Sequence, residues 1–321
     1  MPVSLLALMR ALDHAVPRSV PALARALRCS ETEARNGIDS LRKLGMDIPA
    51  VRGKGYRLAL PFEPLDESKL KRLLQPLAPA LDLQVLEQID STNAWLLRDA
   101  ENAKTGRACI AEIQTAGRGR RGRSWYTVPG SSLAFSMRWR FERPLDYLAG
   151  LSLAAGVAVA RVLHAAGAAE VRLKWPNDVL YRQRKLAGIL VETQSGSDHS
   201  VAVVGVGINL RLPAAVRERI DQAVTDLAAA ADPLPERNLL AARLLGELAR
   251  TLEEFALSGF AGVREEWQAL HAYQGQTVRV RGAGAETSGR VTGVAADGAL
   301  LVATEAGERR YYGGDISLRA A

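Results

Sequence analysis

The feature that most constrains how this chain can fold is the spacing of its apolar residues, which changes twice along the sequence. Residues 5–44 have the spacing of helices, and residues 83–258 mix strand-like with helix-like stretches. Residues 275–312 instead alternate over short segments separated by glycine-rich turns. At roughly 150 residues per domain, a length of 321 residues allows two or three domains. We therefore expect an α+β protein made of three differently built units.

The N-terminal unit is predicted to be a winged helix-turn-helix. Helical spacing occurs over residues 5–15, 20–27 and 31–44, and Ser30 is the expected N-cap of the third helix. Residues 46–60 then predict two short strands around a basic, glycine-rich turn, which would add the wing. The alternative is a three-helix interaction module with a solvated basic face.

The same unit carries an excess of positive charge. Residues 1–60 hold ten basic and five acidic residues, so they account for +5 of the formal net charge of +7, and the rest of the chain is nearly balanced. A basic module on a near-neutral body favours a polyanionic partner for the module, and with the wing it favours DNA. The side chains expected to contact DNA are Arg28, Ser30, Arg35, Arg42, Lys43, Arg52 and Lys54.

Membrane and disulfide-rich classes do not fit this sequence. The longest apolar run, Leu151 to Ala160, is cut short by Arg161 and His164, whereas a span needs about 20 apolar residues. The N-terminus places its first basic residue after an apolar run, the reverse of a secretory signal. Only two cysteines occur, Cys29 and Cys109, far apart in the chain. We expect a cytoplasmic protein without a membrane span, a disulfide framework or a cysteine metal cluster.

The central and C-terminal units are predicted from local spacing and turn residues. In the centre, strands are expected at residues 84–89, 108–114, 133–139, 171–175, 185–193 and 200–209. Helices are expected at residues 92–103, 145–166 and 238–258. Four strands of a small β-barrel are expected at residues 277–281, 289–294, 299–304 and 309–312.

The most unusual segment is Gly117 to Trp125, here named the Arg-Gly loop, with four arginines and three glycines directly after a predicted strand. It satisfies the pattern G-x-G-x-x-G, but Tyr126 to Gly130 cannot begin the helix that a bound pyrophosphate would need. Glycines keep the backbone mobile, and guanidinium groups match phosphate and carboxylate oxygens. A second nucleic-acid contact is the alternative; the position inside the central unit favours a small anionic ligand.

Two neighbouring segments add polar groups at strand ends. Lys174 to Asp178 ends a strand in a turn that presents two polar side chains. Arg184 to Glu192 begins a strand with Lys185, followed by a small residue and Gly188 that permit close approach. A lone lysine at a strand start is usually solvated surface. Its occurrence with a polar turn and the Arg-Gly loop favours a site.

A third group of polar residues follows two other strands. Ser91, Thr92 and Asn93 come after the first central strand, and Gln114 ends the second. Ser91 alone is a good helix N-cap, and capping is the alternative reading. The functional interpretation is a neutral pocket whose hydroxyls and amides pair with the polar head of an otherwise apolar ligand.

Taken together, these motifs resemble those of the biotin protein ligases. The resemblance also includes Gly207 to Leu210 and Gly313 to Arg319, and it covers essentially the whole chain. The helix-turn-helix makes the chain similar to the bifunctional ligases that repress the biotin operon. The resemblance implies a catalytic domain similar to class II aminoacyl-tRNA synthetases and lipoate ligases, and a C-terminal SH3-like β-barrel. The implied limits are 1–62 for the winged helix-turn-helix, 63–82 for a connector, 83–272 for the catalytic domain and 273–321 for the barrel.

The resemblance also implies roles for single residues. Those implied to bind biotin are Ser91, Thr92, Asn93, Gln114, Arg118, Gly119, Arg120 and Lys185. Those implied to bind the nucleotide are Arg121, Arg123, Trp125, Asn177 and Asn209. Those implied to act in the chemistry are Lys185, Asp178 and Arg120.

The implied ligands are biotin and ATP, with Mg²⁺ carried by the ATP phosphates and no metal ligand assigned on the protein. The implied partners are a biotin carboxyl carrier protein, operator DNA upstream of biotin-synthesis genes, and a second copy of the chain in a homodimer promoted by the adenylate. Joining a carboxylate to ATP brings two anions together, so the site needs cations. The acyl-adenylate product hydrolyses easily, so a loop must close over it.

Three alternatives stay open at the level of the sequence. The first is a ligase whose DNA-binding module does not function, because Glu31 and Glu33 begin the presumed recognition helix and would face phosphates. The second is a repressor that binds biotin without ligating it, against which Lys185 and Asp178 argue. The third is a lipoate or octanoate ligase, against which the Arg-Gly loop argues.

Overall fold

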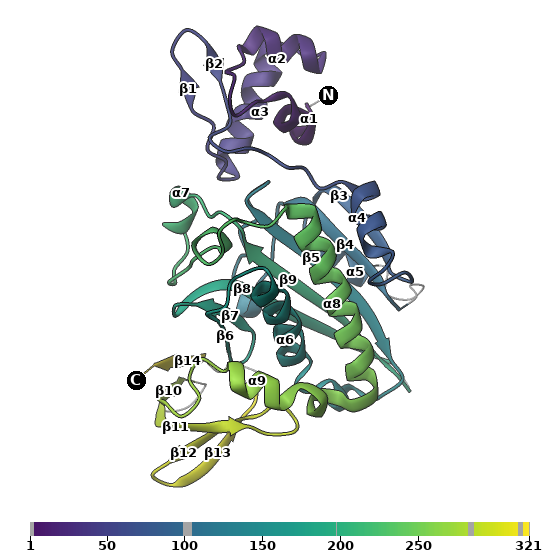
Figure 1. Cartoon of the computed structure of the whole chain (residues 1–321), viewed down its shortest axis with the longest axis vertical. Helices are drawn as coiled ribbons and strands as arrows, with labels where there is room; N and C mark the ends of the chain where they lie inside the picture. The colour runs from purple at the N-terminus through teal and green to yellow at the C-terminus, as the bar shows by residue number, and fades with distance from the viewer. Residues whose placement is uncertain (1–2, 99–104, 197, 282–285, 314–316, 321) are drawn as a thin grey trace.

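The computed structural model describes residues 3–98, 105–196, 198–281, 286–313 and 317–320. Figure 1 shows three units along the longest axis: a helical N-terminal unit at one end, a mixed α/β body in the middle, and a small β unit at the other end. This order confirms the coarse architecture expected from the sequence, with a helix-turn-helix in front, a mixed sheet in the centre and a β-sheet unit last.

The N-terminal unit has the expected helices and a short wing. Its elements are α1 (Leu5–Ala11), α2 (Val20–Leu27), α3 (Glu31–Lys43), β1 (Ala50–Val51) and β2 (Gly55–Tyr56). Helix α1 ends four residues before the predicted limit, because Asp13 Oδ1 accepts hydrogen bonds from the backbone of Ala15 and Val16 and turns the chain. Ser30 caps α3 as predicted, in a reciprocal pair with Glu33.

The body is built on one seven-stranded sheet in the order β3-β4-β5-β9-β8-β7-β6. Its strands are β3 (Asp82–Ile89), β4 (Arg107–Gln114), β5 (Ser132–Phe141), β6 (Val171–Lys174), β7 (Asp178–Tyr181), β8 (Arg184–Ser195) and β9 (Ser200–Asn209). Only the β3–β4 pairing is parallel. All ten residues of β9 are buried, which agrees with its apolar sequence and its place between β5 and β8. Strand β7 was not predicted, because its four residues directly follow the polar turn that dominates the sequence there.

Helices cover both faces of this sheet (Figure 1). The helices of the body are α5 (Thr92–Arg98), α6 (Leu151–Ala165), α7 (Ala214–Arg217), α8 (Arg237–Ser258) and α9 (Arg264–Leu270). Short 3-10 turns are η1 (Arg120–Gly122), η2 (Leu145–Leu148), η3 (Leu227–Ala229) and η4 (Gly259–Val263). Helices α6 and α8 pack on one face, and α5 packs on the other over Cys109 and Val203. The predicted helix 92–103 agrees with α5 as far as residue 98, and residues 99–103 lie outside the described residues.

The stretch Leu145–Ala165 is long and apolar enough to cross a membrane by length and composition alone. In the structure, 67% of its most apolar 18-residue section is buried inside the protein, where α6 packs on α8 and the sheet. Its apolar character therefore belongs to a core helix, as expected for a helix that is hydrophobic on nearly all sides.

The predicted connector contains a helix that the sequence did not reveal, α4 (Glu67–Leu74), which packs on α8. The chain before α4 is tied to the body by Glu63, whose carboxylate accepts hydrogen bonds from Asn238 Nδ2 at 2.6 Å and from the Arg237 backbone at 2.8 Å. Arg237 also forms an almost fully buried ion pair with Glu112 at 2.8 Å. This segment is therefore held against the body rather than free.

The C-terminal unit is a five-stranded antiparallel sheet in the order β13-β12-β11-β10-β14. Its strands are β10 (Thr277–Arg281), β11 (Thr287–Val294), β12 (Leu300–Thr304), β13 (Gly307–Tyr311) and β14 (Ser317–Ala320). The first four correspond to the predicted strands, and β14 was not predicted. Of the terminal motif that carried part of the resemblance, residues 314–316 lie outside the described residues.

Candidate active site

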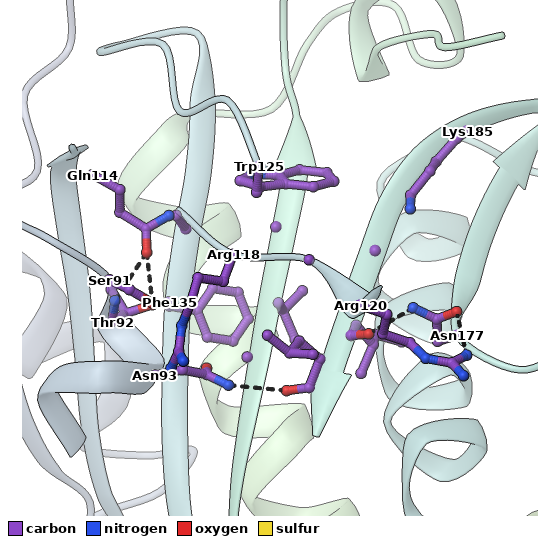
Figure 2. A pocket seen from close by; sticks show the side chains of 18 residues that line it. Ser91, Thr92, Asn93, Gln114, Arg118, Arg120, Trp125, Phe135, Asn177 and Lys185 are labelled. Atoms are coloured by element: carbon purple, nitrogen blue, oxygen red, sulfur yellow. Dashed lines mark hydrogen bonds between the residues drawn. The ribbon is translucent and has the colours of Figure 1, made fainter. Parts of the chain in front are cut away.

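Most of the predicted site residues of the body gather around one pocket (Figure 2). Its walls come from the start of α5, the end of β4, the Arg-Gly loop, and strands β8 and β9. The predicted residues that line it are Ser91, Thr92, Asn93, Gln114, Arg118, Gly119, Arg120, Trp125, Asn177 and Lys185. The sequence thus identified residues that lie together although they are almost 100 positions apart.

One end of the pocket is neutral and polar. The backbone N–H of Thr92 donates to Gln114 Oε1 at 2.9 Å, and the other end of the Gln114 amide donates to Thr127 at 2.9 Å. Ser91, Thr92 and Gln114 are all buried. The carbonyl of Ser91 accepts from the N–H of Trp95, so Ser91 occupies the N-cap position of α5 while its side chain lines the pocket. The position of Ser91 therefore fits a helix cap, and its predicted contact with a ligand stays a prediction.

Asn93 lies at the same end and is bonded to three elements. Its Nδ2 donates to the Leu190 carbonyl at 3.2 Å and to Glu192 Oε2 at 2.8 Å. Its Oδ1 accepts from Ser136 Oγ at 2.5 Å, and Ser136 also lies 2.7 Å from Thr92 Oγ1. Both amide protons of Asn93 are used within the protein, so this side chain holds the pocket together. The predicted contact of Asn93 with biotin stays a prediction.

Ser136 is a residue of this network that sequence reasoning missed. It is fully buried on β5 and connects Thr92 with Asn93. The available signal was a hydroxyl inside the apolar strand SLAFSMRWRF, because a buried polar side chain needs a partner.

Glycines on β8 and β9 make room for the pocket side chains. A Cβ at Gly205 would lie 2.1 Å from Asn93 Oδ1, and one at Gly207 would lie 2.2 Å from the Trp125 ring. A Cβ at Gly188 would lie 3.1 Å from Lys185 Nζ. The close approach predicted at Gly188 is therefore present, and β9 adds two further positions of the same kind.

The other end of the pocket is charged. Lys185 Nζ lies 2.6 Å from Asp178 Oδ1, and both side chains are less than one-fifth exposed. Lys185 Nζ also lies 5.8 Å from the centre of the Trp125 ring. Arg120 Nη1 donates to Asn177 Oδ1 at 3.1 Å, and the Asn177 amide donates to the Ile189 carbonyl at 2.8 Å (Figure 2). The predicted polar turn, the lysine and the loop arginine are thus brought together.

A second hollow adjoins the first and shares its charged wall. Arg121, Arg123 and Asp178 line this hollow with Gln222, and Lys185 and Trp125 line both. The indole Nε1 of Trp125 is buried and has no hydrogen-bond partner within the described chain. Two ligands, or two parts of one ligand, could therefore meet at Lys185.

The Arg-Gly loop folds back on itself above these hollows. The N–H of Gly119 donates to the Arg123 carbonyl at 2.7 Å, and that of Trp125 donates to the Gly117 carbonyl at 2.8 Å. Arg121 adopts a left-handed backbone with φ of 58°, and Gly122 follows with φ of 69°. A Cβ at Gly117 would lie 2.4 Å from the Trp125 carbonyl oxygen. The close approach of these two ends of the loop therefore requires glycine at position 117.

Asn209 does not line either hollow. It is buried, and its Nδ2 donates to the Thr225 carbonyl at 3.0 Å. Thr225 in turn donates its N–H to the Lys185 carbonyl at 2.9 Å. In this structure Asn209 therefore supports the segment beside Lys185, and its predicted contact with the nucleotide stays a prediction.

Some of the residues predicted to contact DNA are bonded within the N-terminal unit, and others are exposed. Arg42 donates to the Ile48 carbonyl at 2.6 Å and stacks on Tyr56, so it stabilises the wing from inside the unit. Ser30 is occupied as the cap of α3, and Arg35 pairs with Glu31 at 3.3 Å. The other predicted residues are exposed: Arg28, Lys43, Arg52 and Lys54.

Within the part of the chain that the structure describes, no group of three or more His, Cys, Asp and Glu side chains could hold a metal ion. The charged groups of the site are two lysines, several arginines and one aspartate. This set suits ligands that are themselves anionic.

Residues 85–209 match the family described as "Biotin/lipoate A/B protein ligase family". The chain is 40% identical over 300 residues to the bifunctional ligase/repressor BirA of Escherichia coli. The aligned region covers 93% of this chain and 92% of that protein. The chain belongs to the biotin protein ligase family. In this ligase, residues 5–57 also match the family described as "HTH domain", and residues 273–319 match the one described as "Biotin protein ligase C terminal domain".

Two other relatives agree with this membership. A biotin--[acetyl-CoA-carboxylase] ligase of Mycobacterium tuberculosis is 41% identical over 58% of this chain and 70% of its own length. The structure of the Aquifex aeolicus biotin protein ligase in complex with biotin and ATP is similar, with a TM-score of 0.64 at 29% identity, over 75% of this chain and 99% of that one. The ligase described here therefore shares its catalytic architecture with an enzyme that binds both ligands.

Proposed function

We propose that this biotin protein ligase joins biotin to AMP in the pocket, transfers biotin to a lysine of a biotin carboxyl carrier protein, and represses transcription with the adenylate as corepressor. The observation that carries the proposal is the meeting of two hollows at Lys185, with a neutral end on one side and loop arginines on the other. A cation at that point would offset the repulsion between a carboxylate and a phosphate. The 40% identity to a bifunctional relative supports biotin over lipoate or octanoate.

The neutral end would hold the head of biotin. Thr92 and Gln114 are already fixed by their own hydrogen bond, so they would meet the ureido group with little loss of side-chain entropy. Ser91 lines the same end, and Arg118 reaches it from the loop with its charge paired with Glu192. The biotin carboxylate would then extend toward Lys185.

The charged end would form the adenylate. A carboxylate oxygen of biotin would attack the α-phosphorus of ATP, and the bond to pyrophosphate would break. Lys185 would stabilise the charge that develops, while Asp178 holds its ammonium group in place. Arg121 and Arg123 would bind the phosphates, and Mg²⁺ carried by ATP would add positive charge there. In the second step the carrier lysine would attack the acyl carbon, and AMP would leave.

The N-terminal unit would bind operator DNA upstream of biotin-synthesis genes. A single module with a charge of +5 binds DNA weakly, so useful repression requires two modules at a fixed spacing, supplied by a homodimer that the adenylate promotes. The exposed residue Arg35 of α3 would enter the groove, and Arg52 and Lys54 would contact phosphates from the wing. The protein would act in the cytoplasm.

We also propose the finer features of the fold that the family resemblance implies. The C-terminal sheet would close as an SH3-like barrel, and the catalytic domain would share the fold of class II aminoacyl-tRNA synthetases and lipoate ligases. The proposed domain limits remain 1–62, 63–82, 83–272 and 273–321.

The ligase function is tested with purified protein, ATP, Mg²⁺, biotin and a biotin carboxyl carrier domain. We expect a mass increase on one lysine of the carrier that depends on ATP. A matched incubation with lipoate should give no product, and biotin but not lipoate should raise the melting temperature. Labelling by lipoate instead of biotin would favour the lipoate ligase, and biotin binding without labelling would favour a repressor only.

The repressor function is tested by a mobility-shift titration against the region upstream of biotin-synthesis genes. We expect biotin and ATP together to strengthen binding to a palindromic site, and added salt to weaken it steeply. Deleting residues 1–60 should abolish DNA binding while ligation stays measurable. If the adenylate has no effect on DNA binding, the protein is a ligase only.

A further inference from the structure

A continuous polar network runs beneath the pocket from its neutral end to the Arg-Gly loop. It begins with Gln114 and Thr92, passes through Ser136 to Asn93, and continues to Glu192 on β8. The last step joins Glu192 to Arg118 of the loop. Figure 2 shows Arg118 reaching from the loop across the pocket toward Asn93.

Glu192 is the point where the loop meets the sheet. Its Oε2 accepts from Arg118 Nη2 at 3.0 Å and from Asn93 Nδ2 at 2.8 Å. The side chain of Glu192 is 27% exposed and that of Arg118 is 43% exposed, so their attraction is only partly screened by water. Neither the family motifs nor the predicted chemistry gave Glu192 a role.

The charge of Glu192 needs an explanation, because a carboxylate close to a site for anions repels its ligands. A neutral acceptor such as glutamine would satisfy the amide of Asn93 equally well. The negative charge instead strengthens the hydrogen bond with Arg118, because a hydrogen bond between two ionised groups is roughly twice as strong as a neutral one. A loop with three glycines has little stiffness of its own, so such an anchor decides how often it stays folded over the pocket.

We propose that Glu192 is a positioning residue that docks the Arg-Gly loop on β8 through Arg118 and thereby sets how long the adenylate is retained. The effect on adenylate retention rests on the proposed function, whereas the docking of the loop is a property of the ligand-free protein. Glu192 does not touch the reacting atoms. It acts on them through the loop.

The docking is tested first without any ligand, because the loop offers trypsin several arginines. In Glu192→Gln, cleavage after Arg120, Arg121 or Arg123 should be roughly fivefold faster than in the wild type, as expected for loss of one partly exposed charged pair. Added salt should speed cleavage of the wild type and leave the variant nearly unchanged. Equal cleavage rates at low salt would overturn the proposal, whether or not the protein is a ligase.

Retention is tested with the adenylate formed in place from biotin and ATP. Glu192→Gln should form it at a rate within about twofold of the wild type and release it roughly fivefold faster. A merely structural role would lower the formation rate and the melting temperature together, and that result would contradict the proposal. If the wild type forms no adenylate, the proposed function fails while the cleavage result still decides the docking.

A double-mutant cycle tests whether Glu192 acts through Arg118. Arg118→Gln leaves the bond between Glu192 and Asn93 intact, so this variant should fold even if Glu192→Gln does not. Adding Glu192→Gln to Arg118→Gln should change loop cleavage by less than about twofold. A full fivefold effect in that background would overturn the proposal. Glu170→Gln, which removes a surface ion pair with Arg182, is the matched control and should change neither readout.

Discussion

The two ends of the pocket hold their polar groups in different ways. At the neutral end, Thr92, Asn93, Gln114 and Ser136 are bonded to one another on a helix and strands, and all four are buried. At the charged end, the cations come from a loop and a strand start, and Lys185 pairs with one acid. The neutral end is thus preorganised for binding, whereas the charged end combines a fixed lysine with a loop that can move. Changes at the two ends should affect different steps.

The largest effect is expected at Lys185. Lys185→Ala should leave the melting temperature nearly unchanged and lower the rate of adenylate formation by about 10² or more, because a cation that stabilises the transition state is lost. Single-turnover formation of the adenylate from ATP and saturating biotin is the measurement. Near-normal adenylate formation by the folded variant would show that Lys185 does not act in this reaction.

Gly205→Ala should instead damage the neutral end. The new Cβ would lie 2.1 Å from Asn93 Oδ1, so Asn93 must move and its bonds to Ser136 and Glu192 must lengthen. We expect a loss of about 1–3 kcal/mol in the free energy of unfolding and biotin binding weakened about tenfold. Urea denaturation and calorimetric titration measure the two effects.

Gly156→Ala is the matched control for this change. A Cβ there would meet Leu173 and Ile189 at ordinary contact distances of 3.4 and 3.6 Å. It should be tolerated with no loss of biotin affinity. If Gly156→Ala and Gly205→Ala lower the free energy of unfolding equally, the close contact at Gly205 has no effect of its own.

A smaller effect is expected from Arg120→Gly, which removes the loop contact with Asn177 and adds backbone freedom. The adenylate should still form but escape about fivefold faster, so that lysines of bystander proteins become labelled. Labelling of an added unrelated protein, compared with the wild type, measures this. A variant that forms no adenylate, or retains it as the wild type does, would show that Arg120 does not act in the lid.

The sequence predicted the elements best where the apolar pattern was uninterrupted. The limits of α2, β9 and β10 agree with the predictions residue for residue. Helix α4 was missed because it follows a proline-rich stretch and is stabilised by packing on α8, which local spacing does not reveal. Strand β14 was missed because its pairing with β10 joins distant parts of the C-terminal unit.

The sequence also identified most of the pocket but not its supports. Motifs point to residues whose chemistry is unusual for their position, such as Lys185 and the loop arginines. Ser136, Glu192 and Gly205 are ordinary residues of strands, and their importance arises only from what β5, β8 and β9 bring next to Asn93. Conversely, Arg42 has the charge of a DNA contact, but its guanidinium is bonded to the Ile48 carbonyl.

The most direct test of the difference between the two ends compares Ser136→Ala with Lys185→Ala in two assays, biotin affinity without ATP and the rate of adenylate formation at saturating biotin. Ser136→Ala should weaken biotin binding roughly fivefold, through loss of a buried hydrogen bond, and leave the saturated rate within about twofold of the wild type. Lys185→Ala should lower that rate by about 10². If Ser136→Ala lowers the saturated rate as strongly as Lys185→Ala, the two ends do not act on separate steps and the account is contradicted.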